Sequence, residues 1–189
     1  MEIGETLYVH RRADWRRWLQ KHFRKMPDIW LVLPNKASGR PSLLYNDAVE
    51  EALCVGWIDS IKKTLGADEA VQRYSPRRSR SPYSQQNVER LRWLLKNDLV
   101  HANVRAAAED AVARPFVFPR DIMAALKKDP EAWKWFQRQS GPYQRIRIWW
   151  VDAARSTAHP EVFPQRLNAL IEACKAKKLV GYGGIEKYF

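Results

Sequence analysis

The sequence predicts an α+β fold in which the N-terminal half combines a small antiparallel β-sheet with helices and the C-terminal half is entirely helical. The apolar run at residues 29–33 and the hairpin pattern over residues 57–74 predict strands, whereas apolar residues recur at helical spacing beyond residue 84. Of the 189 residues, 46% are apolar, and they include nine Trp, seven Tyr and six Phe. That share is sufficient for a hydrophobic core, and it excludes a chain that is disordered throughout.

The first elements are a helix, a strand and a second helix. Apolar side chains at helical intervals predict a helix over residues 13–25. The continuous apolar run Ile29–Leu33, closed by Pro34, is typical of a buried strand. Residues 35–41 are predicted to form a loop, and Asn46 is expected to cap the next helix.

A β-hairpin is expected after Gly56. Residues 57–65 are rich in β-formers, residues 66–68 (Gly-Ala-Asp) form a turn, and residues 70–74 return as the opposite strand. Residues 75–84 contain two prolines and are therefore not a helix. Ser84 is expected to be the N-cap of a helix that runs to about residue 96 with Leu91 and Leu95 inside.

The clearest boundary in the chain is the proline-bracketed segment 115–119. We expect an α+β domain over residues 1–114, a linker over 115–119 and a helical module over 120–180. Helices are predicted at residues 101–112, 121–128, 130–139, 142–155 and 164–178. The glycine-rich tail, residues 181–184, is expected to lie on the surface without helical structure.

The chain is strongly basic, with 33 Lys and Arg against 21 Asp and Glu and a formal net charge of +12. Such a charge attracts polyanions, so an anionic small molecule, an acidic protein partner and nucleic acid are all candidate partners. A solvated basic surface with no selected partner explains the charge equally well. No apolar run approaches the roughly 18–20 residues of a membrane helix, and no secretory segment is recognised, which favours a cytoplasmic protein.

The densest polar cluster is a candidate anion cleft around the expected hairpin and the arginine-rich loop that follows it. Guanidinium groups beside a helix N-terminus, with serine hydroxyls nearby, provide bidentate donors for a phosphate or carboxylate. The alternative is a solvated arginine loop in which Asp59 pairs with one arginine. The candidate residues are Trp57, Asp59, Arg73, Arg77, Arg78, Ser81, Tyr83, Ser84 and Asn87.

Catalytic and metal-binding patterns are sparse. The four histidines form no i, i+4 pair, so no metal site is predicted, and no nucleotide-binding or other cofactor fingerprint occurs. Cys54 and Cys174 are expected to be buried, inert thiols. Glu50 and Glu51 are interpreted as one exposed carboxylate and one at the rim of a helix, with Glu51 an ion-pair partner first and a general base second.

Several segments resemble one bacterial family. The run Ala48–Ser60 resembles the Ala-Leu-Cys-x-Gly-Trp-Ile-Asp segment of YdeI/OmpD-associated proteins, also called bacteriocin-protection proteins. The similarity continues through residues 74–78 and 81–87, with Tyr83 where the family usually has Trp. In the C-terminal half, Ala132-Trp133-x-x-Phe136 followed by Tyr143-x-Arg145 is similar to the helical module of that family. The resemblance implies a stress or antimicrobial-protection role, and it implies no catalytic mechanism.

Three functional hypotheses follow. The first is a non-enzymatic protection protein that binds an anionic ligand or partner through the basic cleft. The second is a nucleic-acid-binding protein that uses the same surface, with Trp57 and Tyr83 as stacking platforms. The third is an enzyme in which Asp59 or Glu51 carries a proton in the arginine cleft.

Overall fold

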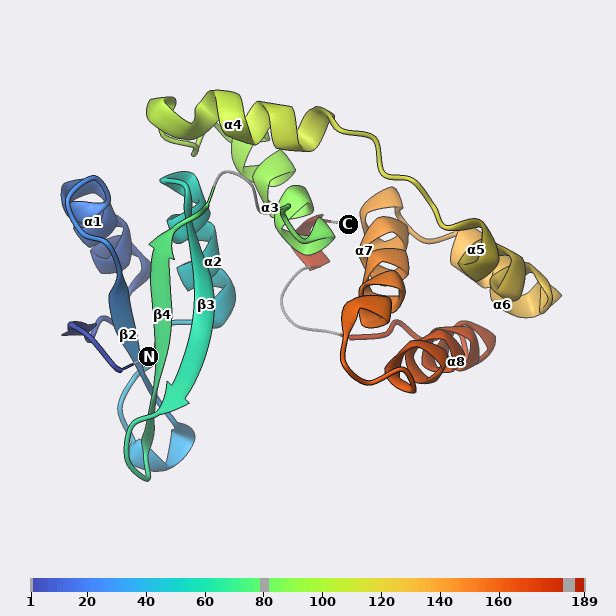
Figure 1. The fold of residues 1–189 in the computed structure, drawn as a ribbon, viewed down its shortest axis with the longest axis horizontal. Helices are drawn as coiled ribbons and strands as arrows, with labels where there is room; N and C mark the ends of the chain where they lie inside the picture. Colours follow the sequence, from blue (N-terminus) through green and yellow to red (C-terminus); the bar gives the residue numbers. More distant parts are fainter. Residues whose placement is uncertain (1, 79–81, 182–185, 189) are drawn as a thin grey trace. The chain divides into compact units, whose positions relative to one another are not determined.

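The computed structural model describes residues 2–78, 82–181 and 186–188. The chain divides into two compact units. The N-terminal unit comprises Met1–Pro82 and Arg90–Ala111, and the C-terminal unit comprises Tyr83–Glu89 and Val112–Phe189. Strands occur only in the N-terminal unit of the described chain, so the predicted α+β class is confirmed (Figure 1).

The N-terminal unit contains a sheet of four strands among the described residues: β1 (Thr6–Leu7), β2 (Ile29–Pro34), β3 (Trp57–Thr64) and β4 (Glu69–Pro76). Their order is β1-β2-β4-β3, which places β3 at one edge of the sheet (Figure 1). The predicted hairpin is confirmed, because β3 and β4 pair antiparallel. The sheet is not purely antiparallel as predicted, since β1 pairs parallel to β2. A strand of two residues leaves no alternation that a sequence pattern could reveal.

One side of the sheet packs against helices α1 (Arg12–His22) and α2 (Tyr45–Cys54). Trp15 of α1 donates its indole N–H to the Ala48 carbonyl at 3.0 Å and lies edge-on to the Tyr74 ring at 5.5 Å. Because side chains alternate along a strand, Ile29 shares this helix-facing side with Tyr74, its partner in the ladder. Trp30 and its neighbours in β2 and β4 form a separate small cluster on the opposite side.

Of the two helix caps predicted at Asn46 and Ser84, the structure confirms only Ser84. Asn46 does not cap α2, because the helix begins at Tyr45 and its N-cap, Leu44, makes no side-chain capping bond. Ser84 does cap α3 (Gln85–Lys96), since its hydroxyl oxygen accepts the Asn87 backbone N–H at 3.3 Å. The buried residue in the last turns of α3 is Leu94 and not Leu95.

The remaining helices follow the prediction closely. The N-terminal unit adds most of α4 (Ala102–Ala113) and the short 3-10 helix η1 (Lys36–Ser38), which lies in the segment predicted as a loop. In the C-terminal unit, Asp129 caps α6 (Pro130–Gln137) and Ser140 caps α7 (Gly141–Asp152). Residues 115–119 form neither helix nor strand, and of the tail predicted at residues 181–184 only Gly181 lies within the described residues. The helical elements of that unit are α5 (Arg120–Lys127), α6 (Pro130–Gln137), α7 (Gly141–Asp152), η2 (Ala153–Ser156), α8 (Val162–Lys175) and η3 (Glu186–Tyr188).

Candidate functional site

Trp57, the first residue of β3, is a core side chain. It is 1% exposed, and its indole N–H donates to the Phe23 carbonyl at 3.1 Å. Its ring meets the Trp18 ring edge-on with centroids 6.1 Å apart. A base can stack only on an accessible ring face. The stacking role predicted for Trp57 is therefore wrong.

Asp59 lies on the helix-facing side of the sheet and is hydrogen-bonded to a phenol. Tyr45, at the start of α2, donates its hydroxyl to Asp59 Oδ2 at 2.9 Å. Tyr45 is 49% exposed, but the partial burial of its hydroxyl and the Asp59 carboxylate raise the pKa of Tyr45 to about 12, because both disfavour a phenolate. The same two causes raise the pKa of Tyr74, the residue opposite Asp59 in the ladder. Both phenols therefore stay protonated at neutral pH.

Arg73 points to the other side of the sheet. Its partner in the ladder is Trp30, and Tyr74, the next residue of β4, pairs with Asp59 on the helix-facing side. The Arg73 guanidinium binds Asp28 Oδ2 through Nη2 at 2.6 Å and through Nε at 3.0 Å. The structure thus separates Arg73 from Asp59 by the thickness of the sheet, and a carboxylate already neutralises its charge.

Arg77 and Arg78 follow the end of β4. The backbone N–H of Arg77 donates to the Gly56 carbonyl at 3.0 Å, which fixes the backbone at this point beside the start of β3. The Arg77 side chain is half-buried. Arg78 is exposed, and among the described residues it has no hydrogen bond or ion pair. Ser81, the next candidate, lies outside the described residues.

The last three candidates, Tyr83, Ser84 and Asn87, belong to the C-terminal unit. The Ser84 hydroxyl is engaged in capping α3, as the sequence predicted. The nine candidate residues are therefore distributed over both units. A common site built from all of them stays a prediction.

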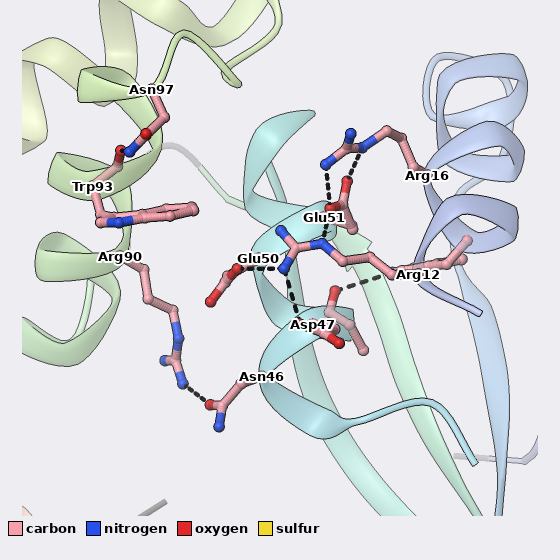
Figure 2. Close-up of polar contacts among 11 residues, drawn as sticks. Arg12, Arg16, Asn46, Asp47, Glu50, Glu51, Arg90, Trp93 and Asn97 are labelled. Atoms are coloured by element: carbon pink, nitrogen blue, oxygen red, sulfur yellow. Dashed lines mark hydrogen bonds and ion pairs between the residues drawn. The ribbon is translucent and has the colours of Figure 1, made fainter. Parts of the chain in front are cut away.

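An ion-pair network that the sequence did not predict joins two buried carboxylates of α2 to partly exposed arginines of α1 (Figure 2). Glu50 and Glu51 are 0% and 1% exposed, so the interpretation of one exposed and one rim carboxylate is wrong. Arg12 Nε lies 2.5 Å from Glu51 Oε1, and Arg12 Nη1 lies 2.9 Å from both Glu50 Oε2 and Asp47 Oδ1. Arg16 contacts both oxygens of Glu51 at 2.6 Å. Glu51 is an ion-pair partner, as expected, but of α1 and not of the arginine loop.

Asn46 has a different role from the predicted helix cap. Its side-chain oxygen accepts a hydrogen bond from Arg90 Nη2 at 2.6 Å, and Arg90 is only 2% exposed (Figure 2). A buried guanidinium requires acceptors because its desolvation is costly. The contact spans 44 residues of sequence, so no local pattern indicates it.

The two cysteines are buried and unlinked. Burial is the main cause that raises the pKa of Cys54 to about 12, and burial raises that of Cys174 to about 11. The predicted burial of both thiols is confirmed, and the raised pKa values favour the protonated form at neutral pH; their inertness stays a prediction. The described residues contain no group of three His, Cys, Asp or Glu side chains that could hold a metal ion.

Comparison with known proteins gives two matches. Residues 7–107, more than half of the chain, match the family model described as Domain of unknown function (DUF8412). Residues 115–177 match the family model described as Bacteriocin-protection, YdeI or OmpD-Associated (OmdA), which confirms the predicted resemblance for the C-terminal half. The N-terminal segments that carried the same resemblance, residues 48–60 and 74–87, fall within the DUF8412 match instead. No curated protein and no solved structure matches the chain. No helix in the described part of the chain combines the length and apolar character needed to span a bilayer.

Proposed function

The chain belongs to the DUF8412 family and matches the bacteriocin-protection OmdA model over residues 115–177, and from this premise we propose a non-enzymatic protection protein. In this proposal the protein binds an anionic ligand or an acidic partner through Arg77 and Arg78. The OmdA match supports the protective role in general terms. The choice of residues depends on the charges of the N-terminal unit.

Most arginines around the sheet already have an anionic or amide partner. Arg73 binds Asp28, and Arg12 and Arg16 bind the carboxylates of α2. Arg78 differs from these, because it is exposed and has no ion pair among the described residues. An exposed guanidinium offers paired donors for a carboxylate or phosphate without any cost of breaking an existing pair. This observation carries the proposal.

The two alternatives have less support. The nucleic-acid hypothesis loses one of its two stacking platforms, because Trp57 is buried. The enzyme hypothesis loses Glu51 as a proton carrier, since Arg12 and Arg16 occupy its oxygens. Asp59, which accepts the Tyr45 hydroxyl, is the carboxylate on which that hypothesis now depends.

The test is thermal melting of wild type, Arg77→Ala and Arg78→Ala with inorganic phosphate, nucleotides, short oligonucleotides and vesicles of anionic lipid. A bound ligand at about 100 times its Kd stabilises the folded state by about 2.7 kcal/mol, which raises the Tm by about 5–10 °C for a chain of this size. We expect such a rise with one anion for wild type and a much smaller rise for both variants.

Arg17→Ala is the matched control, because Arg17 is also an exposed arginine, at 77%, but lies in α1. It should respond to the anion like wild type. An oligonucleotide shift that disappears with salt would favour the nucleic-acid alternative. The absence of a shift with every anion would refute a defined anion site at Arg77 and Arg78.

A further inference from the structure

The edge strand β3 contains a β-bulge that changes where one lysine points. Asp59 is opposite Tyr74 and Lys62 is opposite Gln72, so three steps along β3 match two steps along β4. Residues three apart in a regular strand point to opposite sides of a sheet. Because the bulge adds one residue, Lys62 lies on the helix-facing side together with Asp59.

A buried side chain holds the bulge in place. Ser60, inside the bulge, has no partner residue in the ladder. The Gln72 side chain, which is 5% exposed, donates its amide N–H to the Ser60 carbonyl at 3.2 Å. This bond satisfies a carbonyl group inside the bulge. The orientation of Lys62 is therefore built into the hairpin.

Lys62 lines a cavity of about 480 Å³ between the sheet, the loop before α2 and the first turn of that helix. The volume falls in the range of small-molecule sites, about 300–1,000 Å³. Leu33, Leu43 and Ala70 form an apolar part of the lining, and Asn35, Ser42 and Thr64 add polar groups. Tyr45 forms part of the wall, and the hydrogen bond from its hydroxyl to Asp59 fixes the ring in that position.

The charge that remains available in this cavity is positive. Glu69 also lines it, but Glu69 is ion-paired with Arg40. Lys62 is exposed and has no hydrogen bond or ion pair within the described residues. An ammonium group beside the apolar part of a mixed lining matches a ligand with a largely apolar body and one negative charge.

We propose that this cavity binds a small apolar molecule with a single anionic group, and that Lys62 binds the anion. The site is separate from the one proposed at Arg77 and Arg78, and it does not depend on it. Tyr45 and the apolar side chains contact the body of the ligand. Gln72 is a positioning residue, because it acts through the bulge.

The probe is 1-anilinonaphthalene-8-sulfonate, an apolar fluorescent anion, and N-phenyl-1-naphthylamine is its uncharged analogue. Fluorescence titration of the wild-type protein should give one sulfonate site per chain. Lys62→Gln should weaken the sulfonate about tenfold, equivalent to about 1.4 kcal/mol, and leave the uncharged analogue unchanged. Its Tm without ligand should equal that of wild type, since Lys62 is exposed.

Lys63→Gln is the matched control, because Lys63 is adjacent in sequence but lies on the opposite side of the sheet, 5.8 Å from the Trp30 ring centroid. It should bind both probes like wild type. Arg78→Ala should also bind the sulfonate normally, which separates this proposal from the preceding one. The proposal is overturned if Lys62→Gln binds the sulfonate with wild-type affinity or if the wild-type protein does not bind it. It is also overturned if Lys63→Gln or Arg78→Ala loses as much affinity for the sulfonate as Lys62→Gln.

Discussion

Gly56, between α2 and β3, should be among the positions of the N-terminal unit where substitution lowers the free energy of unfolding most. Its φ is +77°, and a Cβ there would lie 2.8 Å from Cγ1 of Val104. A left-handed conformation costs an L-residue about 1–2 kcal/mol. Overpacking adds about 1–3 kcal/mol. Alanine also restricts the unfolded chain, which offsets about 0.4–1 kcal/mol. Gly56→Ala should therefore lower the free energy of unfolding by about 2–4 kcal/mol.

Gly66 provides a matched control for the steric part. Its φ is +79°, but no atom lies within 4 Å of the position of its Cβ. Gly66→Ala should thus show only the conformational cost, about 1 kcal/mol. Urea unfolding followed by tryptophan fluorescence and far-UV circular dichroism measures both variants.

A double-mutant cycle with Val104→Ala isolates the contact itself. Because truncation of Val104 removes the methyl group nearest to the new Cβ, the double variant should recover about 1–2 kcal/mol relative to the sum of the single changes. The reasoning is refuted if Gly56→Ala costs no more than Gly66→Ala, or if the two changes are simply additive.

Three further predictions concern the two thiols, the Tyr45 phenol and the Glu51 carboxylate. Neither Cys54 nor Cys174 should react with N-ethylmaleimide in the folded protein at neutral pH, and both should react in urea, because burial raises their pKa values to about 12 and about 11; a thiol modified in the folded state would contradict this. The pKa of Tyr45, raised to about 12, means that the folded state holds this proton more tightly than the unfolded chain, whose phenol titrates near 10. The stabilisation from this proton is full below about pH 10 and is lost as the pH rises toward 12. The free energy of unfolding, measured with urea between about pH 9 and pH 12, should therefore fall less steeply with pH for Tyr45→Phe than for wild type. Equal pH dependences of the two free energies would argue against this reasoning. Glu51→Gln should lower the free energy of unfolding by about 2–3 kcal/mol, less than for a fully buried pair because its two arginines are partly exposed; a loss below about 0.5 kcal/mol in the same urea assay would show that the network contributes little.

The parts of the fold that the sequence predicted depend on local chemistry. The Ser84 cap, the apolar run of β2 and the turn between β3 and β4 are each determined by residues close together in the chain. The two-residue strand β1 was missed because it exists through its parallel pairing with β2. The bulge in β3 was missed for a related reason, since it is fixed by Gln72 of the neighbouring strand.

The site was less predictable, because its charges are balanced over long sequence separations. Arg73 is neutralised by Asp28, which lies 45 residues earlier in the sequence. Glu50 and Glu51 are buried because α1 supplies Arg12 and Arg16. A count of local charge treats such groups as exposed. It cannot distinguish an arginine in an ion pair from one, such as Arg78, that remains accessible.

The bulge at Ser60 has a consequence for the protein in concentrated solution. An edge strand presents backbone N–H and C=O groups that a strand of another molecule can pair with, which starts edge-to-edge aggregation. In β3 the bulge interrupts the regular spacing of those groups, and Lys62 and Lys63 place two positive charges in the second half of the strand. Two copies of the chain cannot join β3 to β3 as a continuous ladder without bringing these lysines into the new sheet. The same irregularity that orients one lysine therefore protects the hairpin from growing into a larger sheet.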